Sequence, residues 1–206
     1  MKELYDEFIK WAKYAGEENL MKCSSGNLSH RIGDKVFISG TGSWLGSISS
    51  EQISLCSVTD SSVISGPKPS IEKNLHLELY RCRKDIDTVL HFQSEYATIV
   101  SCMENKPTNF NVTLEIPLYV GTSIPAIPFL LPGSDELAQA VVEAMRNGAN
   151  AALLSNHGQV VCGSSYQDCI QKAIFMEMAC RIIVAAGSNT SFIPKDQILE
   201  LLKLKK

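Results

Sequence analysis

Apolar and polar residues repeat with two different periods along the chain. Residues 1–16 carry an apolar side chain at every third or fourth position with charges between them, which predicts an amphipathic helix. Residues 26–42 instead contain two short apolar runs on either side of Gly33 and Asp34, which predict two strands joined by a turn. The chain therefore mixes helices with strands from its beginning.

The same pattern continues to the end of the chain. A serine before an apolar helical run and a glycine after it mark helix ends, with Ser70 and Ser134 as N-caps and Gly148 as a stop. Further helices are predicted over residues 95–104, 166–187 and 194–206, and strands over 88–94, 114–120, 123–130 and, as a pair, 151–163. Helices that alternate with strands and hairpins predict one layered α/β domain over residues 1–206.

Composition narrows the class of protein. The chain has 206 residues, 45% of them hydrophobic and 20% charged, with a net charge of -3, which is ordinary for a globular domain. Basic residues are scattered, so nucleic acid and anionic membranes are not expected partners. The cysteines are odd in number and form no C-x-x-C pair, which favours a reducing compartment. With no signal peptide or spanning segment in the sequence, we expect a soluble, cytoplasmic protein.

The stretch "VLHFQS" places two polar residues in an otherwise apolar strand. Side chains alternate along a strand, so His91 and Gln93 share one face while Leu90 and Phe92 share the other. Polar side chains on a buried face require partners. This face is therefore the first candidate for a functional site.

Three residues on rigid elements form a possible metal-ligand set. His91 lies on a predicted strand, His157 at a tight turn and Glu72 at a helix start, and together they suit zinc or a similar divalent ion with one open position. Each histidine taken alone is better explained structurally. His30 is expected to be exposed near a turn, and His76, one helical turn after Glu72, is expected to be structural.

Small and hydroxyl residues form a second group. "SSGN", "SGTG" and "KPSIE", at residues 24–27, 39–42 and 68–72, combine glycines with hydroxyl side chains. Glycine lets a backbone approach a ligand, and Ser70 at a helix N-terminus adds the positive end of the helix dipole. The pattern suits a phosphate site, although ordinary turns have the same composition.

Five segments in order resemble the class II aldolase/adducin-head family, in particular its L-fuculose-1-phosphate aldolase branch. They are "SSGNLSHR", "VFISGTG", "KPSIEKNLHLELYR", "DIDTVLHFQSEYAT" and "LLSNHGQVVCG". The resemblance implies a three-layer α/β/α domain with a central, largely antiparallel sheet. It also implies a homo-oligomer, commonly a tetramer, with active sites between neighbouring subunits.

The resemblance also implies roles for single residues. A divalent metal, usually zinc, is held by the positions of His91, Gln93 and His157, and Glu72 matches an acid/base residue that can also touch the metal. The positions that match phosphate and substrate binding are Gly26, Asn27, Thr41, Gly42 and Ser70.

The activity implied is that of a metal-dependent aldolase. It would cleave a phosphorylated ketose to dihydroxyacetone phosphate and an aldehyde through an enediolate stabilised by the metal. Alternatives in the same family are a sugar-phosphate 4-epimerase and a methylthioribulose-phosphate dehydratase with Glu115 as base. A metal-free, adducin-like binding module is the alternative outside catalysis.

The chain departs from the family pattern at several positions. Gln93 stands where the family usually has histidine, and its harder amide oxygen makes manganese or magnesium more reasonable beside zinc. Ile71 stands where the aldolase often has a second phosphate-binding serine. The last helix has no tyrosine, and Tyr119 is out of register with the other active-site tyrosine.

Overall fold

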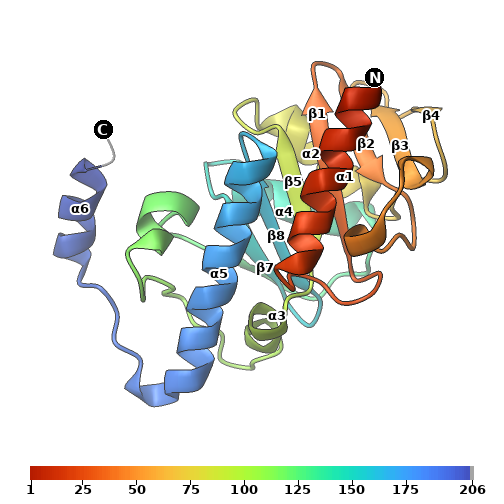
Figure 1. Cartoon of the computed structure of the whole chain (residues 1–206). Coiled ribbons are helices and arrows are strands. Elements are labelled where there is room, and N and C mark those ends of the chain that lie inside the picture. Colours follow the sequence, from red (N-terminus) through yellow and green to blue (C-terminus); the bar gives the residue numbers. More distant parts are fainter. Residues whose placement is uncertain (205–206) are drawn as a thin grey trace.

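A computed structural model describes residues 1–204 and shows a three-layer α/β/α domain around one sheet (Figure 1). Helices α1 (Lys2–Glu17) and α5 (Tyr166–Ala186) cover one face of the sheet, and α2 (Lys73–Cys82) and α4 (Asp135–Met145) cover the other. Helix α3 (Glu95–Ser101) packs against α5, and α6 (Lys195–Lys203) lies near the C-terminus. No described helix is long and apolar enough to cross a membrane.

The sheet has eight strands in the order β4-β3-β2-β1-β5-β8-β7-β6, and only β6 and β7 pair in parallel. The predicted largely antiparallel sheet is thus confirmed. The strands are β1 (Gly26–Ile32), β2 (Lys35–Ser39), β3 (Ile53–Ser57), β4 (Val63–Ser65), β5 (Thr88–Phe92), β6 (Ala126–Ile127), β7 (Ala151–Leu154) and β8 (Gly158–Gly163).

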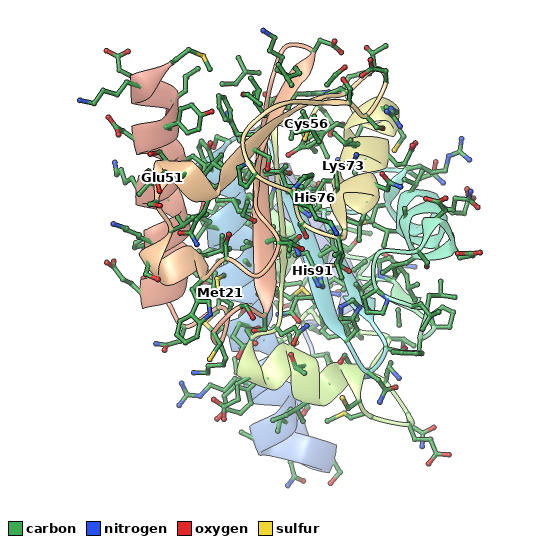
Figure 2. The ribbon with its side chains drawn as sticks, turned by 90° about the vertical axis from the view of Figure 1, so that its right-hand side faces the viewer. Met21, Glu51, Cys56, Lys73, His76 and His91 are labelled. Carbon is green, nitrogen blue, oxygen red and sulfur yellow. The ribbon has the colours of Figure 1, made fainter. Side chains whose placement is uncertain are left out.

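Strand β5 divides its side chains between two apolar cores. Leu90 and Phe92 belong to the core beneath α1 and α5, whereas Val89 belongs to the core beneath α2 and α4. His91, two residues after Val89, therefore lies on the α2 side, where Figure 2 also places His76. The alternation predicted for this strand is confirmed.

Antiparallel pairing brings distant segments to one edge of the sheet. The start of β1 lies beside the end of β5, with Asn27 opposite His91. The end of β5 likewise lies beside the start of β8. A bridge between Gly40 and Pro69 adds the loop before α2 to the same edge. Strand ends and loops that carry polar residues thus converge there.

Several predicted elements are wrong or displaced. Residues 114–120 form a short π-helix (Ile116–Val120) rather than a strand, since Pro117 lacks the N–H that a ladder needs. The strand predicted at 123–130 is only the two-residue β6. Helix α2 begins at Lys73 with Glu72 at its N-cap position, so Ser70 is not the cap.

The last helix was predicted to reach residue 206. It ends at Lys203, and residues 205–206 lie outside the described part of the chain. The sequence pattern predicts neither β3 nor β4; β4 is only three residues long and all three residues are exposed. Both nevertheless extend the sheet beyond β2.

Candidate active site

One pocket of about 300 Å³ opens at the edge of the sheet where these segments meet. It is lined by every candidate site residue from the sequence, namely Gly26, Asn27, Thr41, Gly42, Ser70, Glu72, His91, Gln93 and His157. Ser24, Ser25, Gly40, Ile71 and Pro132 complete the lining. The structure therefore brings the two predicted groups, the metal ligands and the hydroxyl segments, into a single site.

Glu72, His91 and His157 form a compact cluster at the base of this pocket. Their nearest ligand atoms all lie within 4.8 Å of one another. His91 Nε2 lies 3.1 Å from Glu72 Oε2, and His157 Nε2 lies 3.7 Å from Glu72 Oε1. Zinc binds such ligands at about 2.0–2.2 Å in a tetrahedron, which places ligand atoms roughly 3.3–3.6 Å apart. The two distances from Glu72 to the histidines, each to a different carboxylate oxygen, lie on either side of that range.

The hydrogen bonds of the cluster also fit a cation. His91 Nδ1 donates to the backbone oxygen of Gln159 at 3.0 Å, which leaves the Nε2 lone pair directed at the Glu72 carboxylate. Within the described residues, the buried Oε1 atom of Glu72 has no hydrogen-bond partner. A lone pair facing a carboxylate, with a buried oxygen left unpaired, is unfavourable unless a cation or proton lies between them. The donor set therefore fits a divalent metal.

The electrostatic environment keeps His157 available as a neutral ligand. Burial lowers the pKa of His157, and the neighbouring His91 lowers it further, while Glu72 opposes the shift. The imidazole is thus neutral at pH 7, the form that coordinates a metal.

Gln93 lies beside the cluster, just beyond the end of β5. Its amide forms no hydrogen bond to any other residue in the described part of the chain, although it lines the pocket. Gly158 makes room for it, because a Cβ atom there would lie 2.8 Å from Gln93 Cγ and 2.5 Å from the Phe92 oxygen. The Gln93 amide is therefore free to contact a ligand.

The hydroxyl side of the pocket is uncharged. Ser70 Oγ accepts a hydrogen bond from the Glu72 backbone N–H at 3.2 Å, and Gly42 has a positive φ of 73° that suits glycine. Thr41 lies between Gly42 and Gly40, and none of the described lining residues is lysine or arginine. An anion here would be held by hydroxyl and amide groups.

Of the expectations for the other two histidines, the one for His30 is wrong. His76 is fully buried and reaches Glu72 through Asn27: its Nε2 atom lies 2.5 Å from Asn27 Oδ1, and Asn27 Nδ2 donates to Glu72 Oε2 at 3.1 Å. His30 is half-buried rather than exposed, since its ring stacks on Tyr166 with centroids 4.0 Å apart. The sheet brings β1 against these partners, which local spacing does not reveal.

Two further candidates lie outside the pocket. Tyr119 packs against Phe175 of α5, on the opposite face of the sheet from the cluster. Glu115 precedes the π-helix and does not line the pocket. Within one chain, the fold thus brings neither Tyr119 nor Glu115 to the pocket.

A fully buried His76 should make stability depend on pH. Burial lowers its pKa to about 3 from the usual 6.5. Below pH 6.5 the histidine binds a proton in the unfolded chain but not in the folded chain. The contribution of His76 to the free energy of unfolding is therefore complete above pH 6.5 and is lost as the pH falls toward 3. The loss should reach about 2–3 kcal/mol near pH 4.5. Urea titrations of the wild type and H76Q across this range should show a shallower slope for the variant, and equal slopes would contradict the assignment.

The family is decided by comparison with known proteins. Residues 6–184 match the class II aldolase and adducin N-terminal domain family. The chain belongs to this family. The predicted resemblance is therefore confirmed, and the sheet and its flanking helices are those of the class II aldolase fold.

Members of the class II aldolase family with different activities resemble this chain. A 3-oxo-tetronate 4-phosphate decarboxylase of Escherichia coli O6:H1 is 32% identical over 203 residues, covering 96% of this chain and 94% of the relative. An L-fuculose phosphate aldolase of Methanocaldococcus jannaschii is 32% identical over 176 residues, covering 85% and 93%. A solved L-fuculose 1-phosphate aldolase superposes with a TM-score of 0.91 at 25% identity, covering 100% and 98%.

Proposed function

We propose that this protein is a metal-dependent lyase that forms the enediolate of a phosphorylated three-carbon ketone. The bond broken joins the carbon that bears a hydroxyl, next to the substrate carbonyl, to a leaving carbon. The leaving group that the pocket favours is carbon dioxide, from a phosphorylated 3-oxo sugar acid. The observation that carries this choice is the 32% identity to a 3-oxo-tetronate 4-phosphate decarboxylase over 96% of this chain, together with a pocket in which this chain supplies one carboxylate, Glu72.

Decarboxylation and aldol cleavage differ in the number of proton transfers that they require. Aldol cleavage needs a base for the hydroxyl proton of the departing aldehyde and an acid for the carbanion. Loss of carbon dioxide needs only the acid, because the departing carboxylate carries no proton to remove. With His91 and His157 assigned as ligands, Glu72 is the proton-transfer group that this chain supplies to the pocket, and decarboxylation requires a single proton transfer from it.

The residues of the site have different roles in the proposed reaction. When bound, a divalent ion supplies Lewis-acid stabilisation of the charge that develops on the substrate oxygens. Glu72 carries the proton on Oε1, the oxygen without a partner among the described residues, and delivers it to the carbon that loses carbon dioxide. Thr41, Gly42 and Ser70 hold the phosphate, and this fixed position lowers the entropic part of the barrier.

The atoms balance for a four-carbon substrate. In a 3-oxo-tetronate 4-phosphate the bond between C1 and C2 breaks, its electron pair forms the C2–C3 enediolate, and carbon dioxide leaves. A proton from Glu72 at C2 then gives dihydroxyacetone phosphate, and solvent returns the proton to Glu72. The same enediolate would arise from a ketose 1-phosphate, so one pocket suits both reactions.

Aldol cleavage of a phosphorylated ketose is the second candidate. Its support is the likeness to the M. jannaschii aldolase and to the solved L-fuculose 1-phosphate aldolase. We propose zinc as the metal, with manganese or magnesium as alternatives because Gln93 offers an oxygen. A homotetramer with sites between subunits remains the assembly expected from the family.

The test supplies both substrates to the protein loaded separately with zinc and manganese. The 3-oxo acid phosphate should yield dihydroxyacetone phosphate and carbon dioxide in equal amounts, and in D₂O the ketone should carry one deuterium at the hydroxymethyl carbon. L-fuculose 1-phosphate should yield dihydroxyacetone phosphate more slowly. The reverse preference would favour the aldolase, isomerised sugar with no triose product would favour a 4-epimerase, and no turnover of either would overturn the lyase proposal.

Two controls locate the reaction in this pocket. The unphosphorylated 3-oxo acid should react poorly, because the hydroxyl side of the pocket then has no anion to hold. Protein treated with a chelator should lose turnover and regain it on reloading. Turnover that survives metal removal would contradict the role assigned to Glu72, His91 and His157.

A further inference from the structure

A file of buried polar side chains runs from Glu72 away from the pocket. Tyr80 Oη lies 2.7 Å from Ser29 Oγ, and Ser29 Oγ lies 2.7 Å from His76 Nδ1. His76 Nε2 lies 2.5 Å from Asn27 Oδ1, and Asn27 Nδ2 lies 3.1 Å from Glu72 Oε2. Asn27 is 8% exposed, and Ser29, His76 and Tyr80 are 0% exposed. These four side chains are therefore largely shielded from bulk solvent.

The carboxylate fixes the direction of every hydrogen bond in this file. Glu72 Oε2 accepts whether the carboxyl group is ionised or carries a proton on Oε1, so Asn27 turns its N–H₂ toward Oε2 and its Oδ1 toward His76. His76 Nε2 must then carry the proton, and its Nδ1 must accept from the Ser29 hydroxyl. Tyr80 in turn donates to Ser29, since its other acceptor, the Asp87 oxygen, is more distant at 3.4 Å.

The opposite direction would harm the site. With the proton on His76 Nδ1, Nε2 would accept from Asn27, and Asn27 would turn its carbonyl oxygen toward the Glu72 carboxylate. Two acceptors would then face each other in a buried place, which costs free energy. Burial also keeps the imidazole neutral by lowering its pKa to about 3, so His76 has one N–H, and its position decides between the two arrangements.

We propose that His76 is a positioning residue: its Nε2–H orients the Asn27 amide, and Asn27 in turn holds Glu72 Oε2 so that Oε1 is presented to His157 and the substrate. His76 touches neither ligand nor substrate, and it acts through Asn27. For the catalytic part this inference rests on the proposed function. The hydrogen-bond directions proposed for His76, Asn27 and Glu72 apply to the protein without metal or substrate, and they can be tested without any catalytic activity.

Purely structural packing would not require this arrangement. Leu75, Leu77 and Leu79 of the same helix are buried apolar residues, so His76 is an exception on this buried part of α2. A buried imidazole costs desolvation and is worth keeping when each of its nitrogens has a specific partner. Two specific partners are present, and one of them leads to the candidate acid.

The first experiment determines which nitrogen of His76 carries the proton, in protein without substrate. Long-range ¹⁵N–¹H NMR spectra of metal-free protein should show His76 protonated at Nε2 and bare at Nδ1 at neutral pH, and the spectra of H76Q should identify the signals. A proton on Nδ1 would overturn the proposal. This measurement needs no turnover, so it is independent of whether the proposed lyase activity is found.

The second experiment compares variants by Co²⁺ affinity and by turnover. H76F removes both hydrogen bonds and should weaken Co²⁺ binding by about 10–100-fold and lower kcat by a similar factor with KM little changed. H76Q keeps an N–H donor for Asn27 and should recover both to within a few-fold. S29A releases the imidazole to take either tautomer and should show a partial loss, and it replaces H76F if that variant does not fold.

A matched control separates positioning from stability. Ser101 is also fully buried, and its hydroxyl donates to the Thr98 oxygen within α3, outside the pocket. S101A should therefore lose a hydrogen bond without changing Co²⁺ affinity or kcat. If H76F matches S101A in Co²⁺ affinity, or if H76Q does no better than H76F, His76 is structural and the proposal is wrong. Altered Co²⁺ affinity without any turnover would uphold the positioning and reject only the lyase.

Discussion

Replacing Glu72 with glutamine is expected to lower kcat for the 3-oxo acid phosphate by about 10²–10⁴-fold. The amide has almost the same volume, and its oxygen still accepts from Asn27 Nδ2, but it has no proton to give to the carbanion. KM should change little, because the phosphate contacts at Thr41, Gly42 and Ser70 remain. Single-turnover kinetics and deuterium incorporation from D₂O measure the protonation step.

Metal content must be measured for the same variant, because Glu72 is also a candidate ligand. Protein loaded to one metal per chain isolates proton transfer from metal loss. E78Q is the matched control, since Glu78 lies on the outer face of α2 and pairs with Arg81. Its turnover should equal that of the wild type. Full turnover by E72Q would show that another group delivers the proton.

Replacing His157 with alanine is expected to weaken zinc affinity by more than roughly 100-fold, the upper end of losses caused by residues that merely support a ligand. The change removes one of three clustered donors and leaves Glu72 and His91 with an incomplete set. Q93H should have the opposite effect, because it places a third imidazole beside His91 and His157. Competition with a chromophoric chelator measures both affinities.

The pH dependence of zinc binding is a second test of whether His157 is a metal ligand. Because the pKa of His157 lies below the usual value, its imidazole should be protonated at a lower pH than an ordinary histidine, and its loss as a ligand should begin correspondingly lower. H30Q is the control, since His30 stacks on Tyr166 away from the cluster. Unchanged zinc affinity in H157A would mean that this cluster is not a metal site.

Local pattern was sufficient for elements whose apolar period is regular. The amphipathic α1, the β1–β2 turn at Gly33 and the Ser134 cap of α4 all lie where the sequence predicts them. The wrong predictions lie where a proline or a very short strand determines the secondary structure. Pro117 converts a predicted strand into a π-helix, and the three-residue β4 is too short and too exposed to leave an alternating pattern.

The site was accessible from sequence to the extent that its residues lie next to turns and glycines. The family pattern brought Glu72, His91, Gln93 and His157 together as one proposal, and the pocket contains all four. It could not reveal the file behind Glu72. The clue was present, because Asn27 and Ser29 lie two apart on a strand and His76 and Tyr80 four apart on a helix, but nothing local says that these two faces meet.

The sequence by itself determined the α/β class, the two-sided character of β5 and the set of residues able to bind a metal or an anion. These depend on side-chain chemistry and on periods of two or about 3.6 residues, which are properties of short segments. Only the tertiary structure decided that Asn27 faces His91, that His76 reaches Glu72 through Asn27, and that Tyr119 lies on the far face. Those facts depend on strand order and register, which are set by the burial of two apolar cores across the whole chain.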